Sequence, residues 1–115
     1  TDGIRRGVDA LLAVDTEVVL LEVPCFDPVD GGGLTAKAER GERWRTDHIT
    51  DLMRAVASTY SDGVTMLGPP AEFCDDPSVG SEVNLRWDGL HYGPLGGAFI
   101  WGRLVDDLLA IPVDY

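Results

Sequence analysis

The chain has 115 residues, of which 44% are hydrophobic and 25% charged, as in a globular domain or a piece of a larger one. Its 9 basic against 20 acidic residues give a net charge of −11, which argues against nucleic-acid binding. Neither a signal-peptide pattern nor an apolar run of the roughly 20 residues that a membrane span needs is found, so we expect no membrane contact from this segment.

The first half of the chain predicts a helix, a strand and a second helix. Apolar residues at helical spacing predict a helix over 2–13. The nearly continuous apolar run over 17–23 is typical of a parallel strand that is covered on both faces. From about 36 to 60, apolar residues recur at three- and four-residue steps, and Gly63 follows in a helix-capping position.

The second half predicts a strand over 64–67, a loop over 68–92 and a helix over 94–109. Strands that alternate with helices indicate an α/β fold with a parallel sheet. Two strands alone make a poor core, so we expect further strands in sequence N-terminal to Thr1. Residues 1–115 are therefore interpreted as a single partial domain.

The long second loop contains an acid and a histidine three residues apart, Asp88 and His91. A carboxylate that accepts a hydrogen bond from imidazole Nδ1 fixes the tautomer, and it stabilises the imidazolium that forms when Nε2 takes a proton. Gly89 between them allows the tight turn that would let the two side chains meet. Without its context, the pair is more typical of a turn aspartate near a helix-start histidine than of a catalytic pair.

The context is the block Asp-Gly-Leu-His over 88–91, with Gly96 five residues after the histidine and a final helix beyond it. This block resembles the last conserved block of the SGNH (GDSL-type) hydrolase superfamily. The stretch from about 17 to 109 also looks like the SGNH domains that are fused to membrane acyltransferases of envelope glycans.

The resemblance implies the C-terminal portion of a flavodoxin-like three-layer α/β/α fold with a parallel sheet. It implies a serine esterase or O-acyltransferase that acts on acyl, typically acetyl, esters of carbohydrate, with Asp88 as the orienting acid and His91 as the general base. It implies no cofactor and no metal. Its substrate would be a small-molecule or glycan acyl ester, and its partner the N-terminal remainder of the same protein.

The other SGNH blocks, including Gly-Asp-Ser and Gly-x-Asn-Asp, are absent from the chain, and Asn84 is its only asparagine. No serine has the strand-to-turn setting of a nucleophile; the candidates are Ser58, Ser61, Ser78 and Ser81. We therefore expect the serine to lie outside these residues and the chain alone to be inactive. The alternative is a non-catalytic binding or interaction module that keeps the fold without a nucleophile.

Other candidate residues carry weaker signals. Cys25 and Cys74 follow the two predicted strands, so they form either a disulfide or two free buried thiols. A disulfide would indicate an extracytoplasmic, cell-envelope setting, and reduced cysteines a cytoplasmic one. Trp87 either walls a pocket or anchors the loop, and His48 is interpreted as structural. A zinc site from these cysteines and histidines lacks any short ligand spacing.

Overall fold

The computed structural model describes residues 1–28, 38–80 and 82–112. Two strands and five α-helices, with one 3-10 helix, follow one another along these residues. In chain order they are α1 (Asp2–Leu12), β1 (Val18–Leu21), η1 (Ala38–Gly41), α2 (Arg43–Ala57), β2 (Val64–Leu67), α3 (Glu72–Asp75), α4 (Pro77–Gly80) and α5 (Pro94–Leu109).

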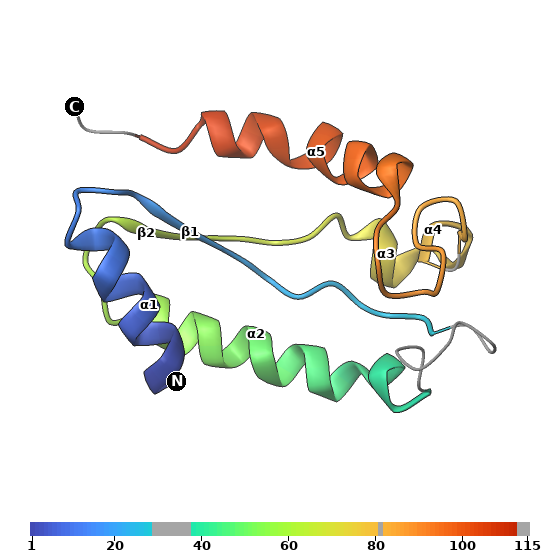
Figure 1. Cartoon of the computed structure of the whole chain (residues 1–115), viewed down its shortest axis with the longest axis horizontal. Helices are drawn as coiled ribbons and strands as arrows, with labels where there is room; N and C mark the ends of the chain where they lie inside the picture. The colour runs from blue at the N-terminus through green and yellow to red at the C-terminus, as the bar shows by residue number, and fades with distance from the viewer. Residues whose placement is uncertain (29–37, 81, 113–115) are drawn as a thin grey trace.

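The two strands pair in parallel, with Val18 opposite Val64 and Leu21 opposite Leu67. In Figure 1, α1 and α2 lie on one side of the strands and α5 lies on the other. The prediction of a mixed α/β chain with a parallel sheet is confirmed at this level, and the sheet has two strands within the described ranges. Both strands therefore deliver the chain to the same end of the sheet, where the predicted site residues lie.

The buried hydrophobic core joins α1, β1 and α2 through Val8, Val18 and Val56. Partly buried apolar side chains surround these three, namely Ile4, Leu12, Leu20, Tyr60 and Val64. They come from α1, the two strands and the end of α2, with Tyr60 just after that helix. The loop with Asp88 and His91 contributes no residue to this cluster.

Helix α2 differs from the sequence-based prediction over its first two turns. It begins at Arg43, and its inward positions there are Thr46 and Thr50, whereas Trp44 is 60% and Ile49 46% exposed. The hydroxyls of both threonines are hydrogen-bonded: Thr46 Oγ1 donates to the carbonyl of Arg43, and Thr50 Oγ1 accepts from the backbone N–H of Val23. Because their hydroxyls are hydrogen-bonded, the two threonines can lie on the buried face of α2. The spacing of apolar residues alone therefore predicts the wrong buried face for this part of the helix.

The predicted loop over 68–92 contains two short helices, α3 and α4. Between them, the carboxylate of Asp76 accepts hydrogen bonds from the N–H and the hydroxyl of Ser78, which caps α4. An isolated antiparallel β-bridge between the backbones of Arg86 and Tyr92 then closes the segment that carries Asp88 and His91. The connection between β2 and α5 is thus a folded segment, which explains how it can hold the side chains of Asp88 and His91 in place.

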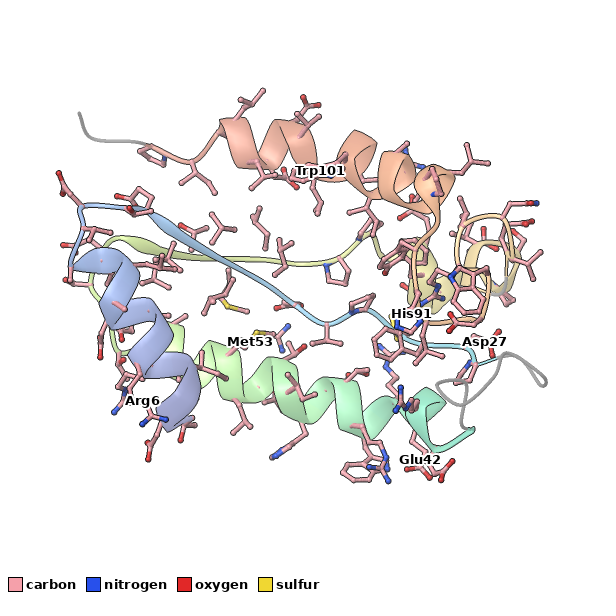
Figure 2. All side chains as sticks on the ribbon, viewed as in Figure 1. Arg6, Asp27, Glu42, Met53, His91 and Trp101 are labelled. Atoms are coloured by element: carbon pink, nitrogen blue, oxygen red, sulfur yellow. A yellow bond between two sulfur atoms is a disulfide. The ribbon has the colours of Figure 1, made fainter. Side chains whose placement is uncertain are left out.

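Helix α5 follows this loop and has Pro94 in its first turn, as predicted. Leu104 is buried, while Leu95, Trp101 and Leu109 are exposed. Figure 2 shows Trp101 on this helix, on the opposite side of the strands from Met53 of α2. Across the described residues, none of the helices combines the length and the apolar character needed to cross a membrane.

Candidate functional site

Asp88 and His91 are in direct contact. Oδ2 of Asp88 lies 2.7 Å from Nδ1 of His91, and Oδ1 accepts hydrogen bonds from the backbone N–H groups of Leu90 (3.0 Å) and His91 (2.7 Å). The carboxylate is fully buried, whereas the imidazole side chain is 54% exposed. The second ring nitrogen, Nε2, has no hydrogen-bond partner among the described residues. This is the arrangement in which an acid orients a histidine and leaves Nε2 for proton transfer.

Gly89 makes the turn between the two residues possible. Its φ is +77°, which is the left-handed region that favours glycine. A Cβ atom added here would lie 1.7 Å from the carbonyl oxygen of Asp27, whose backbone N–H donates to the carbonyl of Gly89 (3.1 Å). The site loop therefore packs against the segment after β1 at a distance that only glycine allows.

Gly96 has a related role at the start of α5. A Cβ atom at this position would lie 2.0 Å from the carbonyl oxygen of Leu85, and the nearby N–H of Gly93 donates to that same carbonyl (3.0 Å). The first turn of α5 can thus approach the site loop closely. The two glycines of the sequence block are explained by backbone packing around the Asp–His pair.

Arg86 is a buried anchor of the site loop that the sequence reasoning missed. One terminal nitrogen donates to the carbonyl of Cys25 and the other to the carbonyl of Gly80 (2.5 Å). Its guanidinium carbon also lies 4.7 Å from the ring centroid of Phe73. The only sequence signal was a lone charged residue between Leu85 and Trp87, which does not by itself distinguish a buried arginine from an exposed one.

Burial shifts the pKa values of two groups in this anchor. Desolvation lowers the pKa of Arg86 from its ordinary value, and the neighbouring Tyr92 and the carboxylates of Asp27 and Asp88 partly oppose that change. Desolvation raises the pKa of the Tyr92 phenol, and the positive charge of Arg86 opposes it. The environment beneath the Asp–His pair is therefore largely closed to water.

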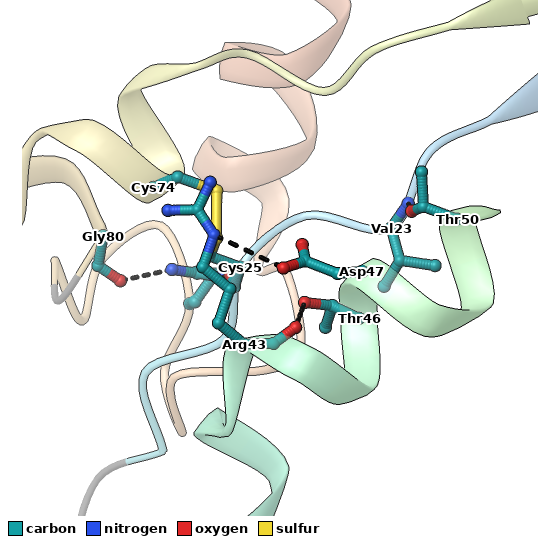
Figure 3. Close-up of a disulfide and its surroundings, with 9 residues drawn as sticks. Val23, Cys25, Arg43, Thr46, Asp47, Thr50, Cys74 and Gly80 are labelled. Carbon is teal, nitrogen blue, oxygen red and sulfur yellow. Dashed lines mark hydrogen bonds and ion pairs between the residues drawn. A yellow bond between two sulfur atoms is a disulfide. The ribbon is translucent and has the colours of Figure 1, made fainter.

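A disulfide joins Cys25, after β1, to Cys74, in α3, with a Cα–Cα distance of 5.2 Å. Figure 3 shows it beside the N-terminal half of α2, from which Arg43 and Asp47 project. Together with the contacts of Arg86 and Gly89, it fastens the segment after β1 to the site loop. Because both sulfur atoms are bonded to each other, neither can act as a thiolate ligand for zinc.

The imidazole of His91 borders a cavity of about 430 Å³ between the site loop and the first turns of α2. Its lining comprises Phe26, Arg40, Arg45, Thr46, Ile49, Leu90 and His91. Trp87 is not part of that lining. Its ring instead stacks on His91, with centroids 5.9 Å apart and an interplanar angle of 17°, and it is 57% exposed.

The other predicted candidates lie apart from the pair. His48 is exposed on α2. The hydroxyls of Ser58, Ser61 and Ser78 donate to partners within their own local segments. Ser81 lies outside the described residues. Within residues 1–28, 38–80 and 82–112, no cluster of three or more His, Cys, Asp or Glu side chains could hold a metal ion.

Comparisons with known proteins return no match. No family model matches the chain, and neither a curated protein nor a solved structure does.

Proposed function

We propose that this chain supplies the acid and the general base of an SGNH-type serine esterase or O-acyltransferase that acts on acyl esters of carbohydrate. The observation that carries the proposal is the buried carboxylate of Asp88, 2.7 Å from Nδ1 of His91, with the imidazole bordering a cavity. A buried acid that is held by two backbone N–H groups and contacts a half-exposed imidazole is suited to proton transfer at Nε2.

In the proposed reaction, Nε2 of His91 takes the proton of a serine hydroxyl while the serine oxygen bonds to the acyl carbon of the ester. The tetrahedral intermediate collapses, the bond to the leaving alcohol breaks, and that alcohol takes the proton from the imidazolium. The acyl-enzyme then passes its acyl group to water or to a sugar hydroxyl, whose proton His91 accepts. As the bond between the acyl carbon and the serine oxygen breaks, His91 returns this proton to the serine oxygen, which restores the free enzyme. Asp88 keeps the ring oriented and stabilises the imidazolium in both steps.

The serine belongs, in this proposal, to sequence outside residues 1–115. The chain contains no Gly-Asp-Ser block, and the described serines are engaged in local hydrogen bonds. A parallel pair of strands with helices on both sides is compatible with the C-terminal portion of a flavodoxin-like three-layer fold. The remaining strands would come from the same outside sequence.

The proposed location is the cell envelope, outside the cytoplasm. The Cys25–Cys74 disulfide supports it, because such bonds persist mainly in oxidising compartments. Acyl esters of envelope glycans are then the substrates within reach.

The test compares the full-length protein that contains this chain with its His91→Ala variant on an acetyl ester substrate. Loss of the general base is expected to lower kcat/KM by about 100- to 10,000-fold. His48→Ala is the matched control, since this second histidine is exposed on α2, and it should leave turnover unchanged. Unchanged turnover in His91→Ala would sink the assignment.

A fluorophosphonate label separates the proposal from the alternative of a non-catalytic binding module. The full-length protein should be labelled on a serine outside residues 1–115, and the isolated polypeptide 1–115 should not be labelled. A folded full-length protein that shows neither labelling nor turnover would establish the binding module in place of the enzyme.

A further inference from the structure

The cavity beside His91 has a charge that contrasts with the rest of the chain. Acidic residues outnumber basic ones by 20 to 9, yet among the described residues that line this cavity two are arginines and none is an aspartate or a glutamate. The two arginines are Arg40 in η1 and Arg45 in the first turn of α2. The acid of the site, Asp88, lies buried behind the imidazole. Two arginines beside one cavity in so acidic a chain favour a ligand that carries negative charge.

The two arginines retain unused hydrogen-bond donors. Arg45 pairs with Glu42 through Nε at 2.9 Å, and Glu42 also accepts from the indole N–H of Trp44 at 2.9 Å. The terminal nitrogens of Arg45 have no hydrogen-bond partner among the described residues, and within the same ranges Arg40 forms no ion pair. A guanidinium with free terminal N–H groups binds a carboxylate through two parallel hydrogen bonds.

The remaining wall of the cavity is apolar. Phe26, Ile49 and Leu90 contribute it, and Thr46 uses its hydroxyl on the carbonyl of Arg43. A volume of about 430 Å³ lies in the range of small-molecule sites, roughly 300–1,000 Å³. A cavity that combines aromatic and aliphatic side chains with two arginines suits a sugar ring, whose C–H face would pack on the apolar side chains while a carboxylate meets the arginines.

We propose that this cavity binds the carboxylate of an acidic sugar, so that the ester substrate is an acylated hexuronate or a glycan that contains one. This inference rests on the proposed function for the identity of the reacting group, an acyl ester at His91. It adds Arg40 and Arg45 as the residues that select the acidic sugar.

The test measures binding to the full-length protein by isothermal titration calorimetry, which needs no serine. Methyl β-D-glucuronide is the probe and methyl β-D-glucoside its neutral match. The glucuronide should bind at least about tenfold more tightly, and Arg40→Gln and Arg45→Gln should each remove about tenfold of its affinity. Arg6→Gln is the control, because Figure 2 places Arg6 on α1, away from His91. This variant should bind the glucuronide as tightly as the unmodified protein does.

Equal binding of glucuronide and glucoside, or unchanged affinity in both cavity variants, would overturn the proposal. A methyl glucoside that carries a succinyl ester is the further probe. If it bound more tightly than the glucuronide, the arginines would recognise a carboxylate on the acyl group and not one on the sugar, which would also overturn the proposal. Failure of the proposed function has a different signature: glucuronide binding that depends on the arginines would persist, while His91→Ala would leave ester turnover unchanged.

Discussion

The two oxygens of Asp88 have separate partners: Oδ2 contacts Nδ1 of His91 at 2.7 Å, and Oδ1 receives the backbone N–H groups of Leu90 and His91. The carboxylate thus fixes both the ring and the turn that carries it. A substitution that keeps the hydrogen bonds of the turn and changes the contact with the ring can therefore test the part that Asp88 plays in catalysis.

Asp88→Asn is such a substitution, because the amide oxygen can still accept from the two backbone N–H groups. The amide NH₂ would meet Nδ1 and favour the tautomer with its proton on Nε2, which cannot act as a base. We expect kcat of the full-length esterase to fall about 10,000-fold, as for the same substitution in a serine-protease triad, with KM little changed.

Asp75→Asn is the control for Asp88→Asn, since Asp75 is an exposed acid of the same loop region. Its kcat should equal that of the unmodified protein. Equal kcat values for the two variants would contradict an orienting role for Asp88.

Gly89→Ala tests the close packing of the turn on the segment after β1. The left-handed φ alone costs alanine about 1–2 kcal/mol, and the Cβ would collide with the carbonyl of Asp27. We expect the free energy of unfolding, measured by urea denaturation, to fall by more than about 2 kcal/mol.

Gly102→Ala provides the matched comparison for Gly89→Ala. This glycine lies in α5 with no atom within 4 Å of an added Cβ, so alanine should stabilise the protein by about 0.5–1 kcal/mol. If both variants were equally stable, Gly89 would not be constrained by its turn.

Local patterns in the sequence predicted much of the fold. The two strands, the terminal helices and the turn around Gly89 follow from apolar runs, periodicity and breaker residues, and these signals are confined to a few neighbouring positions. The start of α2 could not be predicted in the same way. Thr50 is buried because a backbone N–H 27 positions away, that of Val23, donates to its hydroxyl, and apolar periodicity carries no record of such a partner.

Some residues of the candidate site could likewise be predicted from the sequence, and others could not. Asp88 and His91 could be paired in advance because they are three positions apart and a glycine lies between them. Arg86 could not be placed, since its partners Cys25 and Gly80 are brought to it only when the segment after β1 and the end of α4 pack together. The cavity likewise draws on Phe26, Arg45 and Leu90, from three separate segments.

Arg86→Met tests whether the buried guanidinium holds the site loop. Methionine keeps much of the side-chain volume but leaves the carbonyls of Cys25 and Gly80 without their donor. Each lost hydrogen bond to a charged group is worth about 1.5–3 kcal/mol, so we expect a loss of stability of at least about 2 kcal/mol in urea denaturation.

The comparison for Arg86→Met is Arg103→Met. Arg103 pairs with Glu72 at 3.0 Å while about half exposed, and such a surface pair contributes at most about 1 kcal/mol. A loss at Arg86 no larger than the loss at Arg103 would refute the anchoring role.

Reduction of the Cys25–Cys74 disulfide should destabilise the chain. A closed loop with a sequence separation of 49 residues corresponds to about 4 kcal/mol of chain entropy in the unfolded state. The bond borders a cavity of about 370 Å³, so small thiol reductants can reach it. Urea denaturation with and without dithiothreitol should show the difference.

The double variant Cys25→Ala with Cys74→Ala is the control for reduction. It should be as unstable as the reduced protein and insensitive to dithiothreitol. Identical urea midpoints for the oxidised and reduced protein would contradict a stabilising disulfide.

Tyr92 gives the chain a specific response to alkaline pH. Burial raises the pKa of its phenol above the ordinary value of about 10, so the unfolded chain loses this proton at a lower pH than the folded chain does. The folded state then binds more protons than the unfolded state. The free energy of unfolding must therefore fall as pH rises from about 10 through the raised pKa, and the contribution is fully present below pH 10.

Tyr92→Phe removes this titration, so its stability should decline less between pH 10 and 11 than that of the unmodified protein, with parallel profiles below pH 9. Tyr60 is the comparison, because a hydrogen bond to Asp9 at 2.6 Å also raises the pKa of its phenol, although it lies at the opposite end of α2 from the site. Tyr60→Phe should reduce a separate part of the decrease in the free energy of unfolding at alkaline pH, and the double variant should reduce both parts. Urea denaturation at half-unit steps of pH measures the slopes, and an unchanged slope in Tyr92→Phe would show that the phenol ionises equally in the folded and unfolded chains.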